Sequence, residues 1–201
     1  MNIQKAIKSL KQKGYSVSYF ENSKDASTYL SHEINNQIVG FGDSDTLLNL
    51  KLYESLSFHN EVYDPQHDLY GWGFLDIAKK SLTASVFLTS INAFSETGEL
   101  VNIDGTGNRI AGSIFGHEKV FLVVGVNKLV PTLEEAVWRA RNVSAPRNAM
   151  RLGLKTPCAK EGTKCFNCSS PDRICNGMMI YLNKMDDIEM EVVIINETLG
   201  F

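Results

Sequence analysis

The sequence lacks a long apolar run, an excess of positive charge and, over most of its length, cysteine. No run approaches the roughly 20 apolar residues that a membrane-spanning helix needs, so we expect no membrane partner. The formal charge of −3 argues against a nucleic-acid partner, because it provides no basic surface. The N-terminal stretch MNIQKAIKSLKQKG is amphipathic and has no apolar core of a secretory signal. We therefore expect a cytoplasmic location, where thiols stay reduced.

The 201 residues suffice for one well-buried α/β domain over residues 1–201, and an apolar content of 43% is ordinary for such a domain. Helical and strand patterns alternate along the chain. Strands are expected at residues 15–20, 38–41, 58–63, 86–89, 100–103 and 120–126. Helices are expected at residues 3–13, 24–35, 73–80 and 133–141, with another after residue 44. The alternation predicts a Rossmann-like, mostly parallel sheet with helices on both faces, in a strand order that the sequence does not give.

Polar residues collect at the ends of three apolar runs between residues 86 and 128. Ser90 and Asn92 follow the first run, the DGTGNR segment follows the second, and Asn127 and Lys128 follow the third. In an open α/β sheet, ligands bind outside the carboxyl ends of the strands. The stretch therefore predicts a concave polar site.

The DGTGNR segment has a direct interpretation as an anion-binding loop. Glycines let the backbone approach a ligand closely, and the helix that follows has free N–H groups in its first turn. Arg109 could add a two-pronged contact to a carboxylate or phosphate. The alternative is a tight turn in which Asp104 caps the helix. The candidate ligand-binding residues here are Asp104, Gly105, Thr106, Gly107, Asn108 and Arg109.

A second loop, GFGDSDT, also joins a strand to a helix and also suits an anion at a helix N-terminus. It lacks the Lys-Ser/Thr ending of a P-loop and the spacing of a dinucleotide fingerprint. Its two carboxylates would repel a multiply charged anion and could instead bind hydroxyls or a cation; a plain helix cap is the alternative. The candidate ligand-binding residues are Gly42, Asp43, Ser44, Asp45 and Thr46.

Glu96 lies between two expected strands, on a loop that could reach the rim of the pocket. There it could act as a base, a nucleophile or a hydroxyl ligand, whereas the alternative is a turn residue of a β-hairpin. Arg141 and Asn142 belong to a basic and amide-rich region that could line the pocket opposite the glycine loops, or be a solvated helix face. We expect Pro146 to break the helix there.

All four cysteines fall in one short segment, within residues 156–176, with the spacing C-x6-C-x2-C-x6-C. A C-x2-C pair places two sulfurs on one metal, and the flanking cysteines complete a four-thiolate set. Zinc and an iron–sulfur cluster both accept such ligands, and the spacing does not choose between them. Metal would clip a C-terminal segment of low apolar content against the sheet. The candidate ligands are Cys158, Cys165, Cys168 and Cys175; a redox-active or simply reduced thiol cluster is the alternative.

Several of these motifs together resemble the lactate-utilisation (LUD) domain family, in its short stand-alone branch with a C-terminal cysteine segment. The resemblance covers residues 40–175 through GFGDSDTL, SETGELVNIDGTGNR, GVNKLVPTLEEA, RNVSAPRNA and TPC…C-x-x-C-SSPDRIC. It implies a fold like that of ribose-5-phosphate isomerase, glucosamine-6-phosphate deaminase and CoA-transferases. In those relatives the first glycine loop, residues 42–46 here, holds a phosphate or an acyl/CoA group. A catalytic glutamate before a glycine is implied for Glu96, although the fuller CoA-transferase motif is absent.

The resemblance also implies a role in redox metabolism, because LUD proteins are associated with L-lactate oxidation through iron–sulfur partner subunits. Three functions remain open at this stage, and the sequence does not decide whether the chain is an enzyme. The first is a metal- or cluster-bearing component of lactate-utilisation-like metabolism with redox partner proteins. The second is an isomerase or transferase that uses Glu96 on a phosphorylated or acyl substrate, and the third is a sensor of a small anion. A homo-oligomer is compatible with all three.

Overall fold

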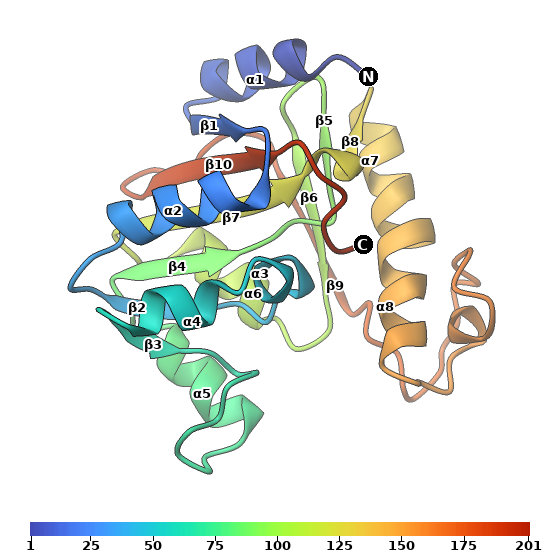
Figure 1. Ribbon diagram of the computed structural model, residues 1–201. Coiled ribbons are helices and arrows are strands. Elements are labelled where there is room, and N and C mark those ends of the chain that lie inside the picture. Colours follow the sequence, from blue (N-terminus) through green and yellow to red (C-terminus); the bar gives the residue numbers. More distant parts are fainter.

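The computed structural model describes residues 1–201 and has a central sheet of six parallel strands. The strand order is β1-β10-β7-β4-β2-β3 (Figure 1). The strands of this sheet are β1 (Ser16–Phe20), β2 (Ile38–Phe41), β3 (Glu61–Tyr63), β4 (Val86–Thr89), β7 (Lys119–Gly125) and β10 (Glu189–Ile195). The predicted α/β class with a mostly parallel sheet is confirmed.

A second sheet of four strands lies beside the first and was not predicted. Its order is β8-β5-β6-β9, with bounds Leu129–Val130, Ala93–Ser95, Leu100–Asp104 and Gly177–Tyr181. The sequence analysis placed residues 100–103 among the strands of one open sheet. In the structure β6 is antiparallel to both β5 and β9, because residues 96–99 fold back as a hairpin with Gly98 at φ 91°.

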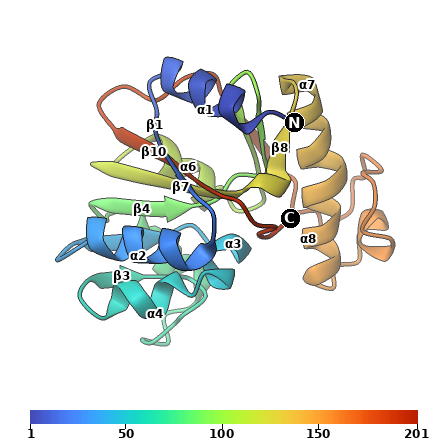
Figure 2. The ribbon, with the colours of Figure 1, turned by 45° about the horizontal axis from the view of Figure 1, so that its top comes forward.

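Helices cover both faces of the central sheet (Figure 2). Alternate side chains of β7 supply the two cores: Leu122 packs towards Leu10 of α1, and Val123 packs towards Leu30 of α2. This is the period-two pattern of a strand that is buried on both sides. The α-helices are α1 (Ile3–Gln12), α2 (Ser23–Glu33), α3 (Asp45–Asn49), α4 (Leu52–Ser57), α5 (Phe74–Ser81), α6 (Asn108–Ile114), α7 (Leu133–Arg139) and α8 (Ala145–Arg151).

The C-terminal part of the chain supplies one strand to each sheet. Strand β10 lies between β1 and β7, and every residue from Met190 to Ile195 is buried. Strand β9 pairs with β6 along its whole length. The low apolar content was expected only of residues 156–176, and neither β9 nor β10 was among the predicted strands.

The predicted break at Pro146 is also wrong. A π-helical turn, Ala140–Ser144, connects α7 to α8, and Pro146 occupies the first turn of α8. Proline is tolerated in a first turn because an N–H there has no partner within the helix. The extra residue of a π turn lets the chain continue as one rod, which Figure 1 shows beside the second sheet.

One strand is shorter than predicted. The pattern indicated a strand at residues 58–63, but β3 begins at Glu61, and Phe58 is 92% exposed. The Asn60 amide instead donates hydrogen bonds to the carbonyl oxygens of Ile34 (2.9 Å) and Leu56 (3.0 Å). The backbone N–H of His59 also bonds to the Leu56 carbonyl oxygen (3.3 Å), so residues 58–60 belong to the turn that ends α4 and the strand begins only after it. Among the helices, none combines the length and the apolarity that crossing a membrane requires.

Candidate functional site

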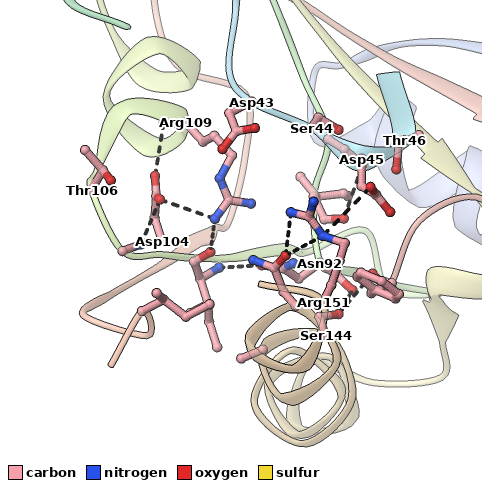
Figure 3. Close-up of a pocket in the computed structure, with 18 of the residues that line it drawn as sticks. Asp43, Ser44, Asp45, Thr46, Asn92, Asp104, Thr106, Arg109, Ser144 and Arg151 are labelled. Carbon is pink, nitrogen blue, oxygen red and sulfur yellow. Dashed lines mark hydrogen bonds and ion pairs between the residues drawn. The ribbon is translucent and has the colours of Figure 1, made fainter. Parts of the chain in front are cut away.

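A polar cavity of about 140 Å³ lies at the carboxyl ends of β2, β4 and β7. The loop after β6 forms one wall, and α8 and the C-terminal residue Phe201 form another. Figure 3 shows Asp104 and Arg109 on one side of the cavity and Asp45 on the other. Its lining is mainly polar and comprises Asp43, Ser44, Asp45, Thr46, Ser90, Ile91, Asn92, Ile103, Asp104, Gly105, Thr106, Asn108, Arg109, Lys128, Ser144, Ala145, Asn148, Arg151, Leu152, Ile174 and Phe201.

Lys128 is the most unusual group of this lining, because its side chain is buried and pairs with no carboxylate. It follows β7 in a short 3-10 turn, Val126–Lys128. Its ammonium donates hydrogen bonds to the hydroxyls of Thr46 (2.9 Å) and Ser90 (3.0 Å). Burial, with repulsion from Arg139 and Arg109, lowers the pKa of Lys128 from 10.5 to about 7. An ammonium has three N–H groups, so one donor is left for a further partner.

A second buried cation, Arg139, stands behind the cavity. Its guanidinium donates hydrogen bonds to the carbonyl oxygen of Asn92 and to the hydroxyl of Ser144, the latter at 2.9 Å. Burial and the nearby Arg147 lower the pKa of Arg139 to about 10. No carboxylate forms an ion pair with this arginine either, so two buried cations stand at the cavity without an ion pair of their own, although Asp45 partly offsets the charge of Lys128.

Arg109, by contrast, is already engaged. Asp104 accepts hydrogen bonds from the backbone N–H groups of Arg109 (3.0 Å) and Ile110 (3.2 Å), so it caps α6. The Arg109 guanidinium lies 3.2 Å from the same carboxylate. Burial raises the pKa of Asp104, but the charge of Arg109 and the N–H donors outweigh it and hold the pKa below its usual value. The structure therefore shows Asp104 as a cap of α6. The Arg109 guanidinium forms an ion pair with this carboxylate.

The loop after β2 contributes two carboxylates. Ser44 caps α3 through a hydrogen bond of 3.4 Å from the backbone N–H of Leu47. Asp43 has a positive φ of 49° and accepts a hydrogen bond from the Gln66 amide. Asp45 lies 3.9 Å from Arg151. Both carboxylates line the cavity and keep free lone pairs for hydroxyl donors.

Eleven predicted ligand-binding residues line the cavity together. They are Asp43, Ser44, Asp45, Thr46, Asn92, Asp104, Gly105, Thr106, Asn108, Arg109 and Lys128. The amide nitrogen of Asn108 is buried without a hydrogen-bond partner, so it offers a donor there. Five predicted ligand-binding residues do not line the cavity: Gly42, Gly107, Asn127, Arg141 and Asn142.

The glycines serve the fold more directly than a ligand. A Cβ on Gly42 would lie 2.7 Å from the Thr89 hydroxyl, and one on Gly105 would lie 2.9 Å from the Ile174 carbonyl oxygen. Gly107 has a positive φ of 94° at the start of α6. Close packing and backbone conformation thus explain all three positions.

Asn127 and the two helix residues have other partners. The Asn127 side chain holds the C-terminal residues, accepting from the backbone N–H of Leu199 at 3.2 Å. Asn142 accepts a hydrogen bond of 3.1 Å from the backbone N–H of Cys165. The Arg141 guanidinium lies 4.0 Å from the Cys165 sulfur. Arg141 and Asn142 therefore face the cysteine segment and not the glycine loops.

Glu96 is not at the cavity rim, which corrects the sequence-based expectation. The hairpin between β5 and β6 presents it to α1, where it accepts hydrogen bonds from the backbone N–H of Asn2 (2.7 Å) and from the Lys5 ammonium (3.2 Å). These two donors lower the pKa of Glu96. Glu96 is therefore a turn residue of the β5–β6 hairpin, which was the alternative given for it.

Sequence reasoning left some lining residues outside the set of candidate ligands. Ser90 directly follows β4 and was noted with Asn92 at the end of that strand, but it was not included among the candidate ligands. Ser144 sits in the π turn, and Phe201 reaches the cavity because Asn127 holds the residues before it. Neither of these two carries a sequence signal.

The four cysteines surround a separate, smaller cavity beside α8, and all are free thiols. No group of three His, Cys, Asp or Glu side chains is arranged to hold a metal ion.

A crystal structure of a DUF162 family protein from Deinococcus radiodurans is similar to this chain at 11% sequence identity, covering 96% of this chain and 95% of that one, with a TM-score of 0.49. No curated protein matches the chain. The LUD domain model matches residues 3–195, nearly the whole sequence. The chain therefore belongs to the LUD domain family.

Proposed function

We propose that this LUD-domain protein binds a small anionic metabolite, a carboxylate or a phosphorylated compound, in the cavity at the sheet edge. The observation that supports this most strongly is Lys128, a buried ammonium without a carboxylate partner. A buried charge is costly unless it is paired. An anion beside the third N–H of Lys128 supplies the missing pair, and Arg139 adds to the attraction from behind.

The size of the cavity limits the ligand. Its volume of about 140 Å³ is below the roughly 300–1,000 Å³ of pockets that enclose a drug-sized ligand. The enclosed part of the site therefore suits a small acidic group better than a whole nucleotide or acyl-CoA. The carboxylates of Asp43 and Asp45 also line the cavity and accept hydroxyl donors, so a small hydroxy acid would find partners for both its carboxylate and its hydroxyl.

The match to the LUD domain family extends this proposal to lactate-utilisation-like redox metabolism, with protein partners that carry the electrons. Here the chain holds the carboxylate substrate or senses it, and turnover depends on those partners.

A second candidate is an enzyme of the isomerase or transferase type. It is favoured by the pKa of Lys128, about 7, which lets the side chain exchange a proton at neutral pH. In this second proposal the reactive group is Lys128 and not Glu96, because Glu96 contacts α1 outside the cavity.

Isothermal titration calorimetry with L-lactate and with inorganic phosphate tests the proposal. The Lys128→Met variant removes the charge, and Lys79→Met, on the exposed face of α5, makes the same change where no cavity exists. We expect binding by the wild type and by Lys79→Met and at least a tenfold weaker affinity in Lys128→Met, about 1.4 kcal/mol. Equal affinities in all three proteins would remove the proposed role of Lys128. Turnover that is lost in Lys128→Met, while binding is kept, would favour the enzyme.

A further inference from the structure

Residues 156–176 form a long connection beside α8 that is held by little burial (Figure 1). Only Thr156 and Gly162 are buried in it, and its one regular element is the 3-10 turn Pro157–Lys160. Ordering so many residues costs conformational entropy, which a segment with few apolar contacts cannot offset by burial. An additional cross-link is therefore expected here.

The four thiols of the chain supply the groups for such a cross-link. Cys158, Cys165, Cys168 and Cys175 all line one cavity of about 20 Å³, which Ala149 and its neighbours on α8 close from the other side. All four are partly buried and free. Their positions in the chain are far enough apart that one shared ligand would tie both ends and the middle of the segment to a single point.

Hydrogen bonds already orient two of the sulfurs. The backbone N–H of Asn167 donates to the Cys165 sulfur at 3.3 Å, and Asn167 has a positive φ of 48° that turns the chain between Cys165 and Cys168. The Thr156 hydroxyl and the Cys158 thiol lie 3.3 Å apart, where either can donate. Contacts of this kind orient metal ligands in proteins.

The charge around the cavity is also suited to thiolates. Arg141 and Arg173 line it, and no carboxylate does. Arg173 is fixed by hydrogen bonds to the carbonyl oxygens of Cys168 (2.9 Å) and Cys175 (3.0 Å). Four thiolates on a divalent ion carry a net charge of about −2, which these two guanidinium groups offset.

We propose that Cys158, Cys165, Cys168 and Cys175 bind a single Zn²⁺ ion as a structural site. The volume of about 20 Å³ has room for one water-sized group, so it favours one ion over an iron–sulfur cluster. No three of the side chains stand in metal-binding geometry, so ion binding includes rotation of the cysteine side chains into the cavity. Four-thiolate zinc sites of this type are closed and stabilise a fold without redox chemistry.

The site also braces the ligand cavity. Ile174 lines both cavities. The next residues of the segment hold the loop after β6, since the backbone N–H of Asn176 donates to the Asp104 carbonyl oxygen at 3.0 Å. A zinc ion that fixes residues 156–176 therefore fixes one wall of the anion site.

The test is the metal content of the full chain, purified anaerobically in reductant. We expect one zinc per chain by mass spectrometry and, after replacement by Co²⁺, the absorption of tetrahedral thiolate coordination. Cys165→Ser and Cys168→Ser should lose the metal, whereas Ser169→Ala, an exposed neighbour in the same segment, should keep it. Iron with acid-labile sulfide would overturn the zinc assignment, and protein that takes up neither Zn²⁺ nor Co²⁺ would overturn the site.

A second measurement does not depend on the folding of variants. Chelation of the wild-type chain should make residues 156–176 susceptible to protease, and added Zn²⁺ should restore protection. An unchanged digestion pattern counts against the site. The L-lactate titration of wild type and Lys128→Met tests the anion site separately, so failure of one proposal is distinguishable from failure of the other.

Discussion

The ammonium of Lys128 donates a hydrogen bond of 2.9 Å to the hydroxyl of Thr46, a residue 82 positions earlier in the chain. This bond joins the end of β7 to the first turn of α3, at the edge where the central strands end. Two hydroxyls accept from two of the three N–H donors of Lys128, but they do not neutralise its charge. A buried ammonium without an ion pair costs stability, and the proposed anion would relieve this cost.

The cost of Lys128 should appear in the pH dependence of stability. Its pKa is about 7 in the fold and 10.5 when it is unperturbed. Between these values the unfolded chain binds the extra proton, so the free energy of unfolding should rise with pH. Below about pH 7 Lys128 is charged in both the folded and the unfolded chain, and its burial lowers the free energy of unfolding by the full amount.

Lys128→Met should lack this rise, because methionine does not titrate. We expect the variant to exceed the wild type in stability at pH 6 by on the order of 2–4 kcal/mol, with a smaller difference near pH 10. Urea unfolding at several pH values measures both proteins, and titration of the tyrosines cancels in the comparison. Parallel pH profiles would show that Lys128 is not strained by burial.

Asp104→Asn should destabilise the fold by about 1–3 kcal/mol, because Asp104 caps α6 and pairs with Arg109. Urea unfolding at neutral pH measures the loss. The matched control is Asp76→Asn on α5, whose carboxylate is exposed and pairs only with Lys79. Its expected effect is within about 0.5 kcal/mol. Equal effects of the two substitutions would contradict the assignment of Asp104 as a cap.

Glu96→Gln should leave the binding of L-lactate or phosphate unchanged, because Glu96 contacts Asn2 and Lys5 and not the cavity. The expected loss of stability is below about 1 kcal/mol, as for other surface pairs. Calorimetry on this variant beside Lys128→Met decides between the two residues. Loss of binding in Glu96→Gln would restore it as a candidate for the site.

Removal of zinc should weaken the binding of the anion without abolishing it. Ile174 and the Asn176 contact to Asp104 connect the cysteine segment to the cavity wall. The Cys168→Ser variant, or the chelated wild type, should therefore bind L-lactate several-fold less tightly, with Ser169→Ala as the control. If affinity is the same with and without metal, the two sites are independent.

The sequence predicted five of the six strands of the central sheet but missed β10 (Glu189–Ile195), which lies between β1 and β7. The strands that are apolar runs buried on both faces are the easiest to recognise. Val120 to Val124 of β7 is the clearest case. The second sheet could not be predicted in the same way, since β6 pairs with β9, which lies more than seventy positions further along the chain. Nothing local to residues 100–104 distinguishes a strand in one sheet from a strand in the other.

The predictions of the site residues succeeded and failed for the same reason. Residues in the connections that leave parallel strands, such as Thr46 at the start of α3 and Lys128 in the turn after β7, were found because strand ends determine where these connections meet. Glu96 follows a strand too, but a hairpin carries it to α1. The direction of a loop depends on its tertiary partners, and sequence spacing does not contain that information.

The most direct test of the anion site is an NMR titration of the Lys128 ammonium in protein labelled with ¹⁵N at lysine. We predict a midpoint near pH 7, as burial requires, which moves upward when L-lactate or inorganic phosphate is added, because a bound anion stabilises the charged form. A midpoint near 10.5 that neither compound changes would contradict the account.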